Sequence, residues 1–212
     1  MSEKRLTNHA DFPRLMKPQW REFRSAVERH QISALYHCTP GANLETIFRV
    51  GGLLSRSEQL RLGIRPAKYH GWGKKWTSLA DYVCLGFVSP RHIRDESDSN
   101  VVLRISPEII WLDGVVFCPC NSAKEWYSPE EIGARDDLDA FEYLFRNEHS
   151  MRLKRQDAEI LVPKAVALDW VNAILFLDDK LLRAVRWRCL RSAPRRFFTR
   201  PSLWRRFMVG AH

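Results

Sequence analysis

The sequence predicts a domain of the α+β class. Short apolar runs typical of strands alternate with helix-like segments, but they lack the regular strand–helix–strand order of a doubly wound sheet. The chain contains neither GxGxxG nor GxxxxGKS/T, which argues against a Rossmann or P-loop phosphate site. Its 212 residues, 45% hydrophobic with 8 Trp and 11 Phe, suit one packed domain with an appendage.

The first part of the chain divides into alternating helices and strands. Apolar residues at helical spacing predict a helix within 11–34, and residues 35–38 have the composition of a short strand. A turn over 39–42 then leads into a helix over 43–50, which the glycine pair Gly51-Gly52 ends.

The stretch 55–78 shows no clear periodicity and contains several Arg, Lys, Gly and Trp residues. Structureless loops of this length are uncommon inside compact domains, so we expect a functional loop there. The elements expected after it are strands at 82–88, 101–105, 159–163 and 173–177, and a helix at 138–147. Residues 111–117 and 124–127 are expected to form short strands or irregular segments.

Charge is concentrated at the carboxyl end. Residues 180–212 contain one Lys, nine Arg and no acidic residue, a net charge of +10. Because the whole chain carries +9, residues 1–179 carry the difference, −1. This asymmetry predicts a domain over 1–179 and a basic extension over 180–212 that meets an anionic partner.

Arginines in the extension lie among aromatic residues, a pattern that suits single-stranded nucleic acid. The candidate nucleic-acid contacts are Arg195, Arg196, Trp204 and Arg205. Two alternatives remain open, namely an amphipathic helix that packs back on the domain and a helix that lies on a membrane surface.

The five cysteines are scattered and odd in number, and no second pair matches the tight Cys118-Pro119-Cys120. We therefore expect reduced thiols and no metal. No run of about 18 apolar residues is present, and the amino terminus lacks an apolar signal core. The expected location is the cytoplasm, without a membrane partner.

Three separated segments share an order and a spacing that make them more specific together than alone. The first spans 36–55 and begins YHCT; the second spans 79–91 and begins LADYV; the third, over 156–162, is QDAEILV. In this order they resemble the DarT family, bacterial toxins that attach ADP-ribose to bases in DNA. The resemblance covers residues 33–178. It implies the ADP-ribosyltransferase fold, in which two small packed sheets flanked by helices enclose an NAD cleft.

The resemblance implies that Glu159 is the catalytic carboxylate of an NAD-dependent mono-ADP-ribosyltransferase. Cleavage of the nicotinamide–ribose bond gives the sugar oxocarbenium character. A carboxylate beside the ribose can stabilise that charge and can accept a proton from the attacking base. By local sequence alone, an exposed glutamate at the start of a strand is the simpler interpretation.

The first segment implies three NAD ligands: His37, Thr39 and Asn43. His37 is expected to donate a hydrogen bond to an NAD ribose hydroxyl, with help from the Thr39 hydroxyl. Asn43 precedes a predicted helix, whose amino terminus suits anionic groups. The structural alternatives are a buried histidine and a helix-capping asparagine.

The family uses an arginine from the loop that covers NAD. The loop offers Arg56, Arg61 and Arg65, and spacing from the second segment favours Arg65 as the catalytic arginine. Tyr82 is expected to stack on nicotinamide, or else to belong to the core. Cys84 and Gly86 depart from the family pattern, which affects the predicted wall of the nicotinamide pocket.

Asp157 lies two residues before Glu159, where ADP-ribosyltransferases meet the acceptor. Gln at this position accompanies base acceptors and Glu accompanies arginine acceptors, so Asp leaves the acceptor open. Single-stranded DNA is the first hypothesis. RNA, a protein side chain, or a nucleic-acid-binding protein without catalysis are the alternatives. A toxin of this type is expected to have an antitoxin on a separate chain.

Overall fold

A computed structural model of the chain describes residues 16–65, 79–87, 100–119, 134–146 and 158–176. Its helices are α1 (Trp20–Arg29), α2 (Leu44–Val50), α3 (Arg56–Arg61) and α4 (Leu138–Tyr143). Its strands are β1 (Leu35–Pro40), β2 (Gly52–Leu54), β3 (Tyr82–Gly86), β4 (Asn100–Ile105), β5 (Val116–Cys118), β6 (Glu159–Pro163), β7 (Ala165–Ala167) and β8 (Val171–Phe176). Short 3-10 turns are η1 (Gly41–Asn43), η3 (Pro107–Trp111) and η4 (Leu168–Trp170).

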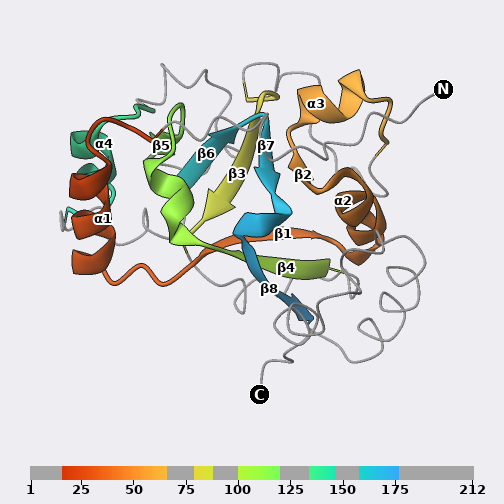
Figure 1. The fold of residues 1–212 in the computed structure, drawn as a ribbon, viewed down its shortest axis with the longest axis horizontal. Helices are drawn as coiled ribbons and strands as arrows, with labels where there is room; N and C mark the ends of the chain where they lie inside the picture. Colours follow the sequence, from red (N-terminus) through yellow and green to blue (C-terminus); the bar gives the residue numbers. More distant parts are fainter. Residues whose placement is uncertain (1–15, 66–78, 88–99, 120–133, 147–157, 177–212) are drawn as a thin grey trace.

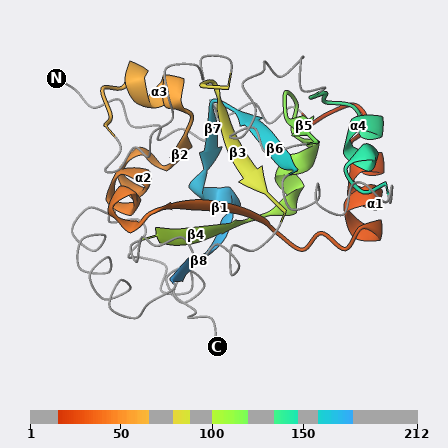
Figure 2. The ribbon, with the colours of Figure 1, turned by 180° about the vertical axis from the view of Figure 1, so that it is seen from behind.

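Two antiparallel sheets of unequal size organise the domain. The larger has the strand order β5-β6-β3-β1-β4-β8, and the smaller pairs β2 with β7. Strand β7 lies in front of β1 in Figure 1 and behind it in Figure 2, so the small sheet covers one face of the large one. The α+β class and the two-sheet arrangement predicted from the sequence are confirmed.

Helices flank the sheets at opposite ends, with α1 and α4 on one side and α2 and α3 on the other (Figure 1). Helix α1 buries Phe23, Ala26 and Val27, whose spacing forms one apolar face. The Phe23 ring centroid lies 5.5 Å from that of Phe117 on β5 and 5.9 Å from that of Phe141 on α4. This aromatic contact joins α1, β5 and α4 in the main core.

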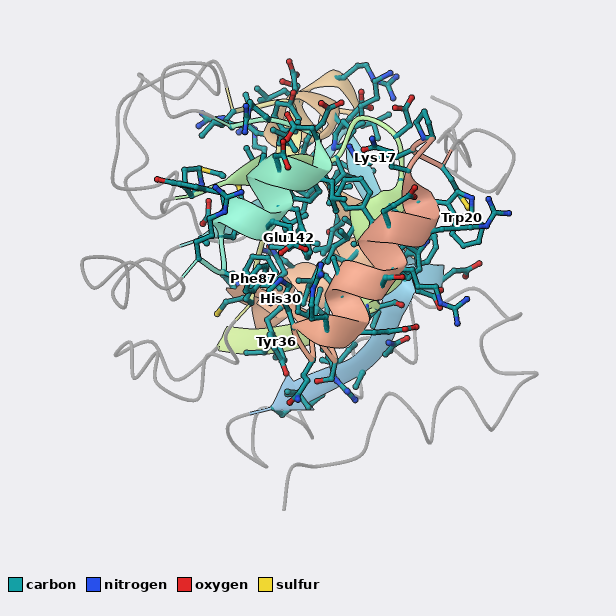
Figure 3. All side chains as sticks on the ribbon, turned by 90° about the vertical axis from the view of Figure 1, so that its left-hand side faces the viewer. Lys17, Trp20, His30, Tyr36, Phe87 and Glu142 are labelled. Carbon is teal, nitrogen blue, oxygen red and sulfur yellow. The ribbon has the colours of Figure 1, made fainter. Side chains whose placement is uncertain are left out.

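A second connection between α1 and α4 is polar at its centre and aromatic at its edge (Figure 3). Glu142 accepts a hydrogen bond from Arg29 and lies 2.9 Å from Nε2 of His30. The His30 ring stacks on Phe145 at 4.1 Å, and Phe145 meets Phe87 edge-on at 5.4 Å. Because Phe87 follows the last residue of β3, this connection joins the helices to the end of a central strand.

Lys17 is buried although it is charged, with only 4% of its surface exposed. Its ammonium donates to the carbonyl oxygens of Val115 (2.8 Å) and Asp136 (2.6 Å). It also lies over the rings of Phe23 and Phe117. Burial lowers the pKa of the Lys17 ammonium, while the nearby Asp136 carboxylate acts in the opposite direction. Lys17, which Figure 3 shows beside the start of α1, thus links the segment before that helix to Val115 and Asp136.

The prediction of an unstructured loop from residue 55 is wrong at its start, because α3 forms there. Ser55 caps this helix: its hydroxyl accepts a hydrogen bond from the Glu58 N–H at 3.3 Å. Glu58 in turn pairs with Arg61. The Ser-x-x-Glu spacing is a helix-start signal that the absence of apolar periodicity concealed. The rest of that stretch, 66–78, lies outside the described residues.

Several predicted boundaries also change. The turn expected at 39–42 is instead the end of β1, which runs to Pro40, followed by η1. The short strand or irregular segment expected at 111–117 shortens to β5, because residues up to Trp111 form η3. Strand β7 was not predicted; its three residues are too few to show alternation. The segment expected at 124–127 lies outside the described residues.

Candidate active site

The large sheet opens between its two central strands. Strand β1 pairs with β4 along six Cα partners, from Leu35–Ile105 to Pro40–Asn100. It shares one Cα pair with β3, between Tyr36 and Gly86. Beyond that pair the strands diverge, so the residues that follow Tyr36 on β1 border a split in the sheet.

His37 is the first residue of β1 past this single pair, and its half-buried ring bridges the split. Nδ1 lies 3.0 Å from the carbonyl oxygen of Cys84 on β3. Burial lowers the pKa of His37, and the Cys84 hydrogen bond acts in the opposite direction. Because a carbonyl only accepts, Nδ1 carries the proton and the neutral ring presents Nε2 as an acceptor. In this tautomer Nε2 can accept a hydrogen bond but has no proton to donate, so the expected donation from His37 is not available at Nε2.

Thr39 and Asn43 form a pair at the far end of β1. Asn43 Nδ2 donates to the Thr39 hydroxyl oxygen at 3.1 Å, and Thr39 is 7% exposed. Asn43 stands at the N-cap position of α2 but makes no side-chain capping hydrogen bond there. The capping alternative for Asn43 is therefore not observed, and its amide acts on Thr39 instead.

Glu159 is the first residue of β6, in the interior of the large sheet. It is half-buried, and its Cα partners are Cys118 on β5 and Gly86 on β3. The preceding residue, Ala158, is 2% exposed, so the backbone enters the strand from a buried position. A carboxylate held on a central strand with neighbours on both sides has a fixed position, which electrostatic stabilisation of a cation requires.

Two other expected residues lie away from Glu159. Tyr82 begins β3 at the opposite end of the β3–β6 pairing, where it packs with Leu79 and Leu161. Four residues of strand separate it from the level of Glu159, about 14 Å. Arg65 is exposed and follows α3, which lies beside the same end of β3 because the Ser57 N–H donates to the Ala80 carbonyl.

The remaining predicted contacts lie outside the described residues. These are Asp157 and the tail residues Arg195, Arg196, Trp204 and Arg205. Within the part of the chain that the structure describes, no group of three or more His, Cys, Asp or Glu side chains is arranged to hold a metal ion. None of the described helices is long and apolar enough to cross a membrane.

The sequence named Gly86 and Cys84 only as departures from the family pattern, and it did not mark Tyr36 as a residue near Glu159. Gly86 and Tyr36 are successive Cα partners in the same row as Glu159. The carbonyl of Cys84 likewise fixes the His37 tautomer. The sequence could not show how these residues are arranged, because strand register and a backbone carbonyl do not depend on a recognisable side chain.

Comparison with solved structures identifies the fold. Thermus sp. 2.9 DarT in complex with carba-NAD+ matches with a TM-score of 0.54 at 19% identity, over 77% of this chain and 93% of that one. Thermus sp. 2.9 DarT in complex with ADP-ribosylated ssDNA gives a TM-score of 0.53 at 17% identity, over 77% and 92%. Thermosipho africanus DarTG in complex with ADP-ribose gives 0.54 at 18% identity over 76% of this chain, which spans about half (49%) of that protein.

The family match places this protein among the ADP-ribosyltransferases, a class that uses NAD as co-substrate. Residues 79–189, more than half of the chain, match the family model described as DarT, ssDNA thymidine ADP-ribosyltransferase. The chain belongs to the DarT family. No curated protein matches it significantly.

Proposed function

We propose that this protein transfers ADP-ribose from NAD to a thymine base in single-stranded DNA, with Glu159 as the catalytic carboxylate. The observation that carries the proposal is the position of Glu159 on a central strand, inside the region that matches the family. An ADP-ribosylated ssDNA complex of a Thermus sp. 2.9 relative supports the acceptor class.

The proposed reaction exchanges one glycosidic bond for another. The bond between nicotinamide and the ribose anomeric carbon breaks, and nicotinamide leaves as a neutral molecule. A ring nitrogen of thymine forms the new bond to that carbon. Thymine in DNA carries a single ring N–H, so its proton must leave, and Glu159 accepts it. The same carboxylate stabilises the positive charge that develops on the ribose.

The NAD side of the site follows from His37. A ribose hydroxyl of NAD donates to His37 Nε2, while the proton on Nδ1 stays bonded to Cys84. Thr39 and Asn43 extend the NAD contacts along β1. Tyr82 lies too far from Glu159 to stack on the nicotinamide, so its predicted role is not part of the proposal, while Arg65 is proposed as a cation for the more distant diphosphate.

The basic extension supplies the electrostatic part of DNA binding. Its net charge of +10 suits a polyanion, and its arginine and aromatic residues suit an unpaired strand. We also propose that the enzyme is cytoplasmic and that a separate antitoxin removes the modification.

Incubation with radiolabelled NAD tests the acceptor. Single-stranded DNA, double-stranded DNA, RNA and a protein mixture are compared, and nucleosides released from the labelled nucleic acid are identified by mass spectrometry. We expect ADP-ribosylated thymidine from single-stranded DNA. If only RNA or only protein is labelled, that molecule is the acceptor in place of DNA, and the protein is still an ADP-ribosyltransferase. If the wild type, like Glu159→Gln, transfers no ADP-ribose to any of these acceptors, the proposed activity is refuted.

A further inference from the structure

One row of cross-strand partners runs through all six strands of the large sheet. Its members, from β5 to β8, are Cys118, Glu159, Gly86, Tyr36, Arg104 and Ala173. Residues directly opposite each other on neighbouring strands project to the same face. Glu159, Tyr36 and Arg104 therefore share one face, and the row between Glu159 and Tyr36 contains only a glycine.

The glycine leaves a space beside the catalytic carboxylate. Apart from Gly86 and its two neighbours in the chain, no atom of the described residues lies within 4 Å of the position that a Cβ on Gly86 would occupy. Two strand spacings separate the backbones of Glu159 and Tyr36, about 10 Å. A flat ring in van der Waals contact with a group on each of its two faces needs about 7–8 Å between those two groups. The space is thus wide enough for one planar ring between the carboxylate and the tyrosine.

We propose that the space above Gly86 is the slot for the acceptor base, which stacks on Tyr36 with its ring nitrogen toward Glu159. The slot rests on the proposed function and names the residues that recognise its acceptor. Tyr36 suits this role because it is half-buried, and it does not belong to either apolar cluster of the described residues. Its ring is held by the strand yet partly available for stacking.

Arg104 extends the slot toward the edge of the sheet. It is the Cα partner of Tyr36 and is half-buried, and its guanidinium makes a long 3.5 Å contact with the Ser33 carbonyl oxygen. Arg104 lies on the β-strand next to that of Tyr36. Its cation is therefore suitably placed for a phosphate of the DNA strand whose base stacks on Tyr36. Nicotinamide is the other planar ring of the reaction, and in NAD its ribose carries a diphosphate, so the Arg104 cation suits either ligand and the two must be distinguished by measuring both affinities.

The first test compares substitutions of Tyr36 in a Glu159→Gln background, which prevents turnover. Affinity for a fluorescein-labelled oligothymidylate is measured by anisotropy, and NAD affinity by calorimetry. Loss of one aromatic–base stack is expected to weaken oligothymidylate binding by about 5- to 150-fold in Tyr36→Leu. Tyr36→Phe keeps the stack and binds as the background does. Tyr143→Leu, an exposed tyrosine on α4, is the matched control and binds normally.

NAD affinity decides which ring the slot holds. If Tyr36→Leu weakens NAD binding as much as oligothymidylate binding, the slot belongs to nicotinamide and the proposal is overturned. Unchanged oligothymidylate binding in Tyr36→Leu overturns it as well. Failure of the wild-type protein to modify any DNA is a different result, because it refutes the proposed function itself.

A second test fills the slot or removes its cation. Gly86→Val places a branched side chain in the open space, and we expect at least a tenfold loss of transfer to oligothymidylate with NAD binding retained. Arg104→Gln is expected to lower the dependence of log affinity on log salt by about 0.7, one phosphate contact on a single strand. The control Arg24→Gln, on the exposed side of α1, leaves that slope unchanged. Full transfer by Gly86→Val would contradict the slot.

Discussion

Glu159 and Gly86 are Cα partners across β6 and β3, so the carboxylate faces a neighbour that has no side chain. A side chain at position 86 would occupy the space beside the carboxylate on the same face. The glycine that departs from the family pattern is thus next to the proposed catalytic residue.

Glu159→Gln is expected to reduce ADP-ribose transfer by about 100- to 10,000-fold, because the amide neither carries the negative charge nor accepts the base proton. Transfer is measured with labelled NAD and oligothymidylate. The change preserves shape, so the thermal unfolding midpoint should stay close to that of the wild type. Glu108→Gln, an exposed glutamate in η3, serves as the matched control with full activity. Equal activity in Glu159→Gln and Glu108→Gln would remove Glu159 from catalysis.

His37→Asn should separate folding from NAD binding. The asparagine amide can still donate to the Cys84 carbonyl, but the Nε2 acceptor is lost. We expect NAD affinity to fall by about tenfold, the value of a lost hydrogen bond of about 1.4 kcal/mol. The unfolding free energy should change little. Calorimetry and urea unfolding measure the two quantities. Unaltered NAD affinity would show that His37 has only a structural role.

The stability of the fold should depend on pH through His37. Burial lowers the pKa of His37 in the folded state, so between that pKa and its ordinary value of about 6.5 the unfolded chain binds more protons. The contribution is complete above about pH 6.5 and decreases as the pH falls below it. Urea unfolding of the wild type and His37→Asn across this range measures the effect. The wild type should lose more stability on acidification than the variant does.

Lys17→Met is expected to destabilise the fold by about 2–5 kcal/mol, since it leaves buried carbonyls without their donor. The affected groups are the Val115 and Asp136 carbonyl oxygens. Lys164→Met, whose side chain is exposed, is the matched control and should be nearly neutral. Urea unfolding at neutral pH provides the measurement. Similar unfolding free energies for both variants would mean that the hydrogen bonds of Lys17 to the Val115 and Asp136 carbonyl oxygens do not stabilise the fold.

Two glycine-to-alanine changes should act in opposite directions. A Cβ on Gly52 would collide with the Val166 carbonyl oxygen across the β2–β7 pair, and a Cβ on Gly86 meets open space. Overpacking predicts a loss of about 1–3 kcal/mol for Gly52→Ala. Gly86→Ala should gain about 0.5–1 kcal/mol, because glycine in a strand costs backbone entropy. Thermal unfolding distinguishes them, and a destabilised Gly86→Ala would contradict the open space.

The basic extension is expected to set the salt dependence of DNA binding. Replacing Arg195, Arg196 and Arg205 together by Gln should lower the slope of log affinity against log salt by about 2, since each phosphate contact on a single strand contributes about 0.7. The control replaces Arg21, Arg24 and Arg61 by Gln, and its slope should match the wild type. Anisotropy titrations at several salt concentrations measure both. An unchanged slope in the first variant would favour an extension that packs on the domain or a membrane.

The sequence by itself determined the class of fold, the order of most elements and the position of Glu159 in a strand. These features are local: apolar spacing defines α1 and β4, and a short motif marks β6. The start of α3 is also encoded in the sequence. The signal is the capping pair Ser55 and Glu58, and not a periodicity of apolar residues.

Only the tertiary structure decided which residues surround Glu159. Strand β6 lies between β5 and β3, and β1 lies between β3 and β4, so neighbours in the sheet are far apart along the chain. A shift of one residue in any of these pairings would turn Tyr36 or Gly86 to the other face. Pairing register depends on how the whole sheet packs, and no short segment encodes it. The row from Glu159 through Gly86 to Tyr36 therefore exists only in the folded protein.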